Sequence, residues 1–140
     1  MKGKKMNEFK GLIALAAENH KKDIKRNEEK FLRLDWVLNN IVLEVNEVRK
    51  EMKPNNRPHL EDELSDILWG WIILVEKLKA SGYVASHEAI IKRGLKKYRE
   101  RIHPLHGDMR DHVLWQEVKL KQKALLKEEK QSIRRQKKAM

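Results

Sequence analysis

Residues 41–69 read IVLEVNEVRKEMKPNNRPHLEDELSDILW, and this stretch decides the fold of the chain. It carries two acidic pairs, Glu44-x-x-Glu47 and Glu63-x-x-Asp66, in two segments whose apolar residues recur at helical spacing. Residues three apart are neighbours on the surface of an α-helix, so each pair presents two carboxylates side by side. The sequence therefore predicts two successive helices, each with an acidic pair.

Both acidic pairs lie at the border of an apolar helix face. In the first segment Glu44 lies at the edge of the apolar stripe and Glu47 just beyond it, so we expect Glu44 to be half buried. In the second segment Glu63 and Asp66 lie on one shoulder, and Gly70, a turn further along, predicts open space beside the acids. The apolar stripes comprise Val37, Ile41, Val45, Val48 and Met52 in the first segment, and Leu60, Leu64, Ile67, Leu68, Trp71, Val75 and Leu78 in the second.

The segment 53–58 between the two helices reads as a turn that ends in a helix start, because Asn is a good cap and Pro is tolerated at the first helical position. If the helices run antiparallel, the two acidic shoulders face each other. Two carboxylates about 5 Å apart repel by about 3 kcal/mol at an effective dielectric near 20, so a cation is expected among them. Mg²⁺ is usually held by a few carboxylates with waters and substrate phosphates. The alternative is four ordinary solvated acids on amphipathic helices.

The length and composition indicate a single globular domain. A chain of 140 residues is long enough to bury a core. The sequence has neither an apolar run of about 18 residues nor a secretory signal, so we expect a soluble, cytoplasmic protein that does not enter membranes. The absence of cysteine excludes disulfides, thiolate metal sites and cysteine nucleophiles.

The formal charge of +11 is concentrated at the ends of the chain. Residues 1–5 contain three Lys, and residues 119–140 contain nine Lys or Arg against two Glu, which leaves residues 6–118 nearly neutral. A basic tail over 121–140 is suited to the phosphates of nucleic acid or nucleotides. The alternative is a solvated, Lys-rich helix end.

The remaining sequence predicts further helices and no strand. One helix is expected over 6–19, followed by a polar connector over 20–26. The helix that carries the first acidic pair should begin near residue 27 or 28, with a possible break around Leu34 and Asp35. The helix that carries the second pair should end at Ser81-Gly82. Ser86 should cap the next helix, and a last helix is expected over 111–135. The predicted fold is an all-α bundle of four to five helices, completed by oligomerisation.

The helix that follows Ser86 is basic on one side. Lys97 and Arg101 are four residues apart, so their side chains point the same way. Cations opposite a carboxylate-bound metal would hold a polyphosphate from both sides and neutralise charge as phosphorus is attacked. The alternative is a solvated charged face.

The order of these motifs resembles the MazG-type nucleoside triphosphate pyrophosphohydrolases over residues 6–120. The matching elements are Glu44-x-x-Glu47, Glu63-Leu-Ser-Asp66-Ile-Leu-Trp, Lys97-Tyr-Arg-Glu-Arg101, His106-Gly-Asp and Trp115-Gln-Glu-Val-Lys119. Two positions depart from the family pattern: Leu43 precedes Glu44 where many members have a second acid, and Ser65 stands where they have Gly. Neither change removes a predicted ligand.

The resemblance implies an all-α enzyme that uses Mg²⁺, or Mn²⁺ as a substitute, to cleave a nucleoside triphosphate into monophosphate and pyrophosphate. It assigns the metal to Glu44, Glu47, Glu63 and Asp66, and activation of the attacking water to one carboxylate or to the metal-bound water shell. Of the carboxylates we favour Glu47, the less buried of its pair. The resemblance assigns phosphate contacts to Lys97, Arg101 and Lys119. Residues 1–120 would form the catalytic domain and 121–140 a basic helical tail. The family assembles as dimers or dimers of dimers, so a homodimer or homotetramer is expected.

No clean motif identifies the residues that contact the base. Four residues on the connector or the acid-bearing side of the second helix are candidates for stacking or hydrogen bonding to a base: Asn19, His20, Trp36 and Asn40. A plain packing role is the alternative for Trp36.

Two other functions stay open at this point. A catalytically inactive helical module could bind nucleic acid or a partner through the basic termini. A purely structural oligomerisation protein would bind neither metal nor nucleotide.

Overall fold

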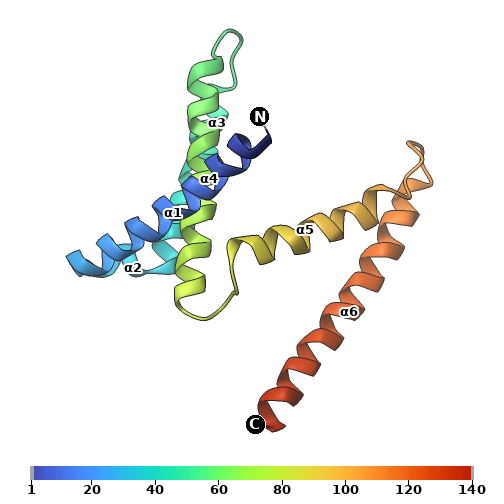
Figure 1. The fold of residues 1–140 in the computed structure, drawn as a ribbon. Helices are drawn as coiled ribbons and strands as arrows, with labels where there is room; N and C mark the ends of the chain where they lie inside the picture. Colours follow the sequence, from blue (N-terminus) through green and yellow to red (C-terminus); the bar gives the residue numbers. More distant parts are fainter. Residues whose placement is uncertain (1, 140) are drawn as a thin grey trace. The chain divides into compact units, whose positions relative to one another are not determined.

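The computed structural model describes the backbone of residues 2–139 and the side chains of residues 8–139. The chain forms two compact units, Met1–Ala89 and Ile90–Met140. Residues 2–139 form six helices and no strand, which confirms the all-α class (Figure 1). The helices are α1 (Lys2–Arg26), α2 (Glu29–Leu32), α3 (Leu34–Glu51), α4 (Arg57–Ala80), α5 (His87–Ile102) and α6 (Asp111–Ala139).

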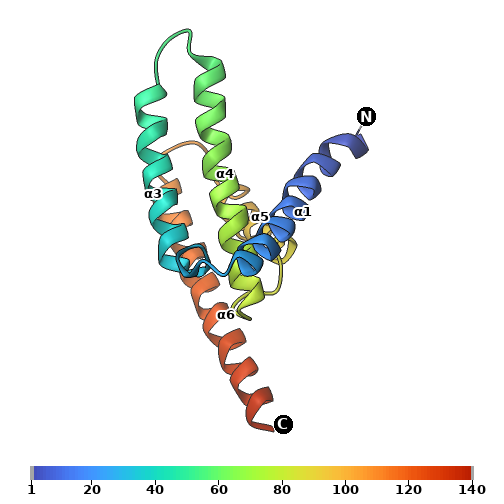
Figure 2. The ribbon, with the colours of Figure 1, turned by 90° about the vertical axis from the view of Figure 1, so that its left-hand side faces the viewer.

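The first unit is built on the antiparallel pair of α3 and α4, which lie side by side and are joined by a short turn (Figure 2). Asn56 precedes α4, and Pro58 lies in its first turn, as expected. The Asn56 side chain makes no bond to the start of α4, however. Its Nδ2 donates to the backbone oxygen of Glu51 at 2.8 Å and to Glu51 Oε2 at 2.6 Å. These bonds tie the turn back to the end of α3.

The core of the first unit lies where α1 and α3 pack against α4. Its buried residues are Ala16 from α1, Val37 from α3, and Ile72 and Ile73 from α4. Phe9, Leu12, Ile13, Ile41, Trp69, Trp71 and Leu74 pack around them and are partly buried. The predicted apolar stripes therefore point inward only in part. Val45, Met52, Leu64 and Leu68 remain exposed.

The prediction of a polar connector over residues 20–26 is wrong, because α1 continues to Arg26. Asp23 in this segment is buried and pairs with Lys77 of α4. Lys25 and Arg26 lie in the last turn, where positive charge suits the helix dipole. A tertiary contact thus keeps a locally featureless segment helical.

The predicted break before the first acidic pair is present, one residue earlier than expected. Arg33 adopts an extended conformation, with φ −81° and ψ 130°, between α2 and α3. The predicted single helix is therefore a short helical segment followed by α3. Phe31 and Trp36, on either side of the break, contact edge to face with ring centroids 4.8 Å apart.

The predicted end of α4 and start of α5 are confirmed. Gly82 has φ +82°, the left-handed conformation that a residue after a helix commonly adopts, and the Tyr83 N–H donates to the Leu78 carbonyl at 2.9 Å. Ser86 caps α5 by accepting a 3.0 Å hydrogen bond at Oγ from the Ala89 N–H. These ends follow from local sequence signals, which explains why they could be predicted.

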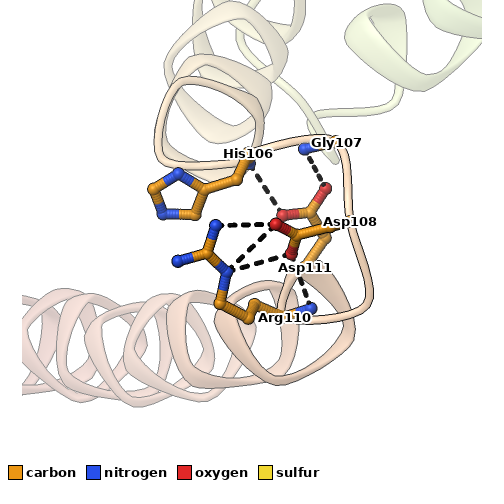
Figure 3. Close-up of polar contacts among 5 residues, drawn as sticks. All are labelled: His106, Gly107, Asp108, Arg110 and Asp111. Carbon is orange, nitrogen blue, oxygen red and sulfur yellow. Dashed lines mark hydrogen bonds and ion pairs between the residues drawn. The ribbon is translucent and has the colours of Figure 1, made fainter.

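The second unit contains most of α5, a turn and α6. Arg93 of α5 makes two hydrogen bonds to the Glu129 carboxylate of α6, at 2.9 and 3.1 Å. In the turn, Asp111 accepts hydrogen bonds from the backbone N–H groups of His106 and Gly107, and Asp108 pairs with Arg110 (Figure 3). The His106-Gly-Asp motif therefore shapes the turn that leads into α6. This helix runs to Ala139, beyond the predicted end at 135.

In the part of the chain that the structure describes, no helix combines the length and the apolar character needed to span a lipid bilayer.

Candidate active site

The two acidic helices bring three of the four predicted metal ligands together. One carboxylate oxygen each from Glu44 of α3 and from Glu63 and Asp66 of α4 lie within 4.8 Å of one another. All three side chains are partly buried. The antiparallel pairing creates this cluster, because it turns the acidic shoulder of α3 toward that of α4. We call Glu44, Glu63 and Asp66 the acid cluster.

The acid cluster holds negative charge that no nearby cation among the described residues balances fully. Partial burial, followed by the charges of Asp66 and Glu47, raises the pKa of Glu44, although a hydrogen bond with Glu63 acts in the opposite direction. Partial burial and the charges of Asp66 and Glu44 likewise raise the pKa of Glu63. A divalent cation would remove this repulsion, and carboxylate oxygens are the ligands that Mg²⁺ prefers. The donor set and its charge therefore fit such an ion.

Glu47 lies beside the acid cluster rather than within it. Its charge raises the pKa of both Glu44 and Glu63, so it is close to both. Its side chain is 45% exposed, and its Oε1 lies 3.2 Å from Lys50 Nζ. Glu47 is thus the fourth predicted ligand, and its partly exposed carboxylate is accessible to water, as a group acting on a water molecule needs.

A cavity of about 440 Å³ opens beside the acid cluster. This volume lies within the range of small-molecule sites. Glu44 and Asp66 form part of its wall, and three of the four predicted base-contacting residues, Asn19, Trp36 and Asn40, also line it. The remaining lining residues are Asp23, Arg26, Phe31, Val37, Ile41, Trp69, Gly70, Ile73 and Lys77. His20, the fourth candidate, instead lies behind the wall, with Nδ1 3.3 Å from Lys77 Nζ.

The expected open space beside the acids is present, since Gly70 lines the cavity with Glu44 and Asp66, but the position of a Cβ at Gly70 is not open. A Cβ atom there would lie 2.8 Å from Cγ1 of Ile41. Gly70 therefore permits α3 and α4 to approach closely just beyond the acid cluster. Trp36 and Trp69 line the same cavity.

A buried ion pair lies in the cavity wall away from the acids. Lys77 is 3% exposed and Asp23 is 4% exposed, and Lys77 Nζ lies 3.0 Å from Asp23 Oδ2. The other oxygen of Asp23 accepts a hydrogen bond from Arg26, which also lines the cavity. We call Asp23, Arg26 and Lys77 the charged wall.

The charged wall was not predicted from the sequence, although one of its residues, Lys77, has a recognisable spacing. Asp66, Gly70, Ile73 and Lys77 are spaced i, i+4, i+7 and i+11, which places them on one face of a helix. This spacing shows that Lys77 faces the same way as Asp66. Asp23 has no such signal, because its partner is 54 residues away.

The three predicted phosphate-contacting residues belong to the second unit. Lys97 is exposed, with Nζ 5.3 Å from the ring centroid of Tyr98. Arg101 is 8% exposed, its Nε donates to Gln122 Oε1 at 2.8 Å, and its guanidinium lies over the ring of Trp115 at 5.3 Å. Lys119 is partly buried on α6. The motif from Lys97 to Arg101 and the motif from Trp115 to Lys119 therefore meet where Arg101 contacts Trp115.

Comparison with known proteins gives one family. The family model described as MazG nucleotide pyrophosphohydrolase domain matches residues 34–106, which is just over half of the chain. The match begins at the first residue of α3 and includes all four acids and the Lys97 to Arg101 motif. Comparison with curated proteins and with solved structures gives no match.

Proposed function

Because the chain belongs to the MazG nucleotide pyrophosphohydrolase domain family, we propose that it is a Mg²⁺-dependent hydrolase of nucleoside triphosphates. Water adds across the bond between the α and β phosphates, and the products are the nucleoside monophosphate and pyrophosphate. The observation that carries the proposal is the acid cluster, three carboxylates within 4.8 Å of one another at the wall of a cavity. The family match supports the reaction class, and the acid cluster supports the proposed position of the metal.

The four acids divide into two roles in this proposal. Glu44, Glu63 and Asp66 would hold the metal, and Glu47 would complete the ligand set. Mg²⁺, or Mn²⁺ in its place, neutralises charge on the phosphates when it is bound. Glu47 also accepts the proton of the attacking water, since its carboxylate is half exposed and lies next to the acid cluster.

The cavity beside the acid cluster receives the nucleoside. The indole of Trp36 offers an aromatic surface on which a base stacks, and base stacking on aromatic side chains contributes about 1–3 kcal/mol. Asn19 and Asn40 offer amide donors and acceptors to the base or sugar. His20 does not line the cavity, so in this proposal it does not contact the base and instead helps to position the Lys77 side chain.

The phosphates are proposed to contact Lys97, Arg101 and Lys119, as the family resemblance implies. Lys97 is the most accessible of the three, and Arg101 is fixed by Gln122 and Trp115. A fixed guanidinium suits phosphate binding, because little side-chain entropy is lost on contact.

The experiment is product analysis of a panel of ribo- and deoxynucleoside triphosphates with Mg²⁺, on the wild type, Glu63→Gln and Glu61→Gln. Glu61 is the matched control, since it lies on the same helix, is exposed and is outside the acid cluster. We expect monophosphate and pyrophosphate from the wild type and from Glu61→Gln. Glu63→Gln should lose at least about 100-fold in turnover, since it removes a direct metal ligand.

Two outcomes contradict the proposal. Release of inorganic phosphate in place of pyrophosphate would mean that another bond is cleaved. Turnover by Glu63→Gln within about threefold of the wild type would mean that the acid cluster does not hold the metal.

A further inference from the structure

The charged wall presents hydrogen-bond donors to the cavity. The Lys77 ammonium has three N–H groups, and two of them are directed to Asp23 Oδ2 at 3.0 Å and to His20 Nδ1 at 3.3 Å. Among the described residues these are the partners of Lys77, which leaves one N–H of a residue that lines the cavity and is 3% exposed. Both carboxylate oxygens of Asp23 are already engaged, one by Lys77 and one by Arg26.

The charged wall is rich in hydrogen-bond donors. Within it one carboxylate faces an ammonium and a guanidinium, and the buried carboxylate of Glu76 is close enough to His20 to act on its pKa. Burial and the charge of Lys77 lower the pKa of His20, against the opposing charges of Glu76 and Asp23, and His20 Nδ1 lies 3.3 Å from Lys77 Nζ. A ligand atom that bonds to Lys77 must be an acceptor, because an ammonium group only donates.

The position of Lys77 relative to the acid cluster indicates which part of a nucleotide reaches it. Lys77 follows Asp66 by 11 positions on one face of α4, a rise of ~16 Å along the helix axis. Side chains on a helix lean toward its N-terminus, so Lys77 leans back toward Asp66. If the triphosphate binds at the acid cluster, as proposed above, the group that reaches Lys77 is the far edge of the base. Trp36 and Trp69 line the space between and suit a planar group.

We propose that Lys77, held in place by Asp23, determines base specificity by donating a hydrogen bond to a carbonyl oxygen of the base. Uracil, thymine, guanine and hypoxanthine carry a carbonyl oxygen where cytosine and adenine carry an exocyclic amino group. The enzyme therefore selects keto bases over amino bases. The buried ion pair of Asp23 with Lys77, rather than the acid cluster, determines this selection. A buried polar group left without a partner by the wrong ligand is the strongest source of such discrimination. This inference rests on the proposed function for the orientation of the nucleotide.

The first test compares kcat/KM for two matched pairs, dUTP against dCTP and ITP against ATP. We expect the wild type to prefer the keto member of each pair by at least about tenfold, which corresponds to ~1.4 kcal/mol. Lys77→Gln presents both a donor and an acceptor, so the preference should fall to within about threefold. The matched control is Lys79→Gln, an exposed lysine on the same helix, which should keep the wild-type preference.

Removing Lys77 also disturbs a buried ion pair, so the fold of each variant is checked by circular dichroism and thermal unfolding. If Lys77→Gln does not fold, the double variant Asp23→Asn with Lys77→Gln replaces the ion pair by two amides and removes the unpaired buried charge. It should show the same loss of preference. A wild type without keto preference overturns the proposal. A Lys77 variant that keeps the keto preference also overturns the proposal. A Lys77 variant that loses activity equally on all four substrates overturns it as well, since that loss would indicate a phosphate contact or a structural role.

A second measurement separates this proposal from the proposed function. Binding of UMP, CMP, IMP and AMP without metal is followed through tryptophan fluorescence, to which Trp36 and Trp69 in the cavity contribute. Tighter binding of UMP and IMP that Lys77→Gln abolishes supports the inference even if no nucleotide is hydrolysed. Hydrolysis without any such preference in binding or turnover refutes the inference and leaves the proposed function standing.

Discussion

Glu63 shows how the acid cluster affects the stability of the fold. Partial burial and the charges of Asp66 and Glu44 raise its pKa above the ordinary value of 4.5. A raised pKa means that the folded state holds the proton more tightly than the unfolded chain does. The metal-free protein therefore loses stability as the pH rises from 4.5 through the raised pKa, and the full penalty is present above that pKa.

Glu63→Gln should consequently raise the melting temperature of the metal-free protein at pH 7. The difference from the wild type should shrink as the pH falls toward 4.5, where the wild-type carboxyl becomes protonated. Thermal unfolding in a chelator, from about pH 4 to about pH 8, measures both effects. Mg²⁺ should reverse the order, since it stabilises only a folded state that binds it. A variant less stable than the wild type at neutral pH without metal would show that Glu63 is not under repulsion.

The sequence predicted the residues whose partners are close along a helix, and missed those whose partners are distant. Glu44 and Glu47, and Glu63 and Asp66, are three apart, and the spacing alone pairs them. Asp23 and Lys77 are 54 residues apart, and their contact depends on how α1 crosses α4. No periodicity in the sequence determines that crossing. The metal-binding and base-contacting roles remain proposals at each of these positions.

At the scale of elements, the close approach of α3 and α4 depends on Gly70. A Cβ at this position would lie 2.8 Å from Ile41 Cγ1, so the Ile41 side chain would have to shift. Overpacking of this kind typically costs about 1–3 kcal/mol. The displaced Ile41 also lines the cavity, so a change at Gly70 alters the shape of the site.

Gly70→Ala should therefore destabilise the protein by about 1–3 kcal/mol and weaken nucleotide binding. Gly11→Ala is the matched control, because Gly11 lies inside α1 and has open space where a Cβ would lie. That substitution should stabilise the protein by about 0.5–1 kcal/mol, since Ala is the better helix former. Urea unfolding of both variants gives the two free energies. If both substitutions changed the free energy of unfolding by small and equal amounts, the distance between α3 and α4 would not depend on Gly70.

Helix ends illustrate what local sequence can and cannot determine. Gly82 and Ser86 mark the end of α4 and the start of α5, and both were predicted because their signals act within one turn. The end of α1 was predicted about two turns too early. Its last two turns are polar, and the buried pair of Asp23 with Lys77, rather than an apolar pattern, fixes them against α4.

At the scale of the whole molecule, the described residues bury few apolar side chains and expose many large ones. Leu38, Val42 and Val45 lie on one face of α3 and are 46%, 60% and 38% exposed. An apolar face of this kind in a chain with so small a core favours an interface. We therefore propose that the protein assembles as a homodimer or homotetramer, as the family resemblance implies.

Val42→Lys should weaken this assembly, because it places a charge in the centre of the proposed interface. Asn39→Lys is the control, since Asn39 is exposed on α3 outside this face. Light scattering after size-exclusion chromatography should give an oligomer for the wild type and Asn39→Lys, and a shift toward monomer for Val42→Lys. A wild-type protein that is monomeric at every concentration tested would contradict the proposed homodimer or homotetramer.

The most direct test of the catalytic site is to locate the metal. Crystals grown with Mn²⁺ and a non-hydrolysable nucleoside triphosphate analogue would show the ion in anomalous difference density. We predict a peak within direct-ligand distance of the carboxylates of Glu44, Glu63 and Asp66, and no such peak in Glu63→Gln crystals. An ion bound by other residues in an active enzyme would contradict the claim that the antiparallel pairing of α3 and α4 builds the catalytic site.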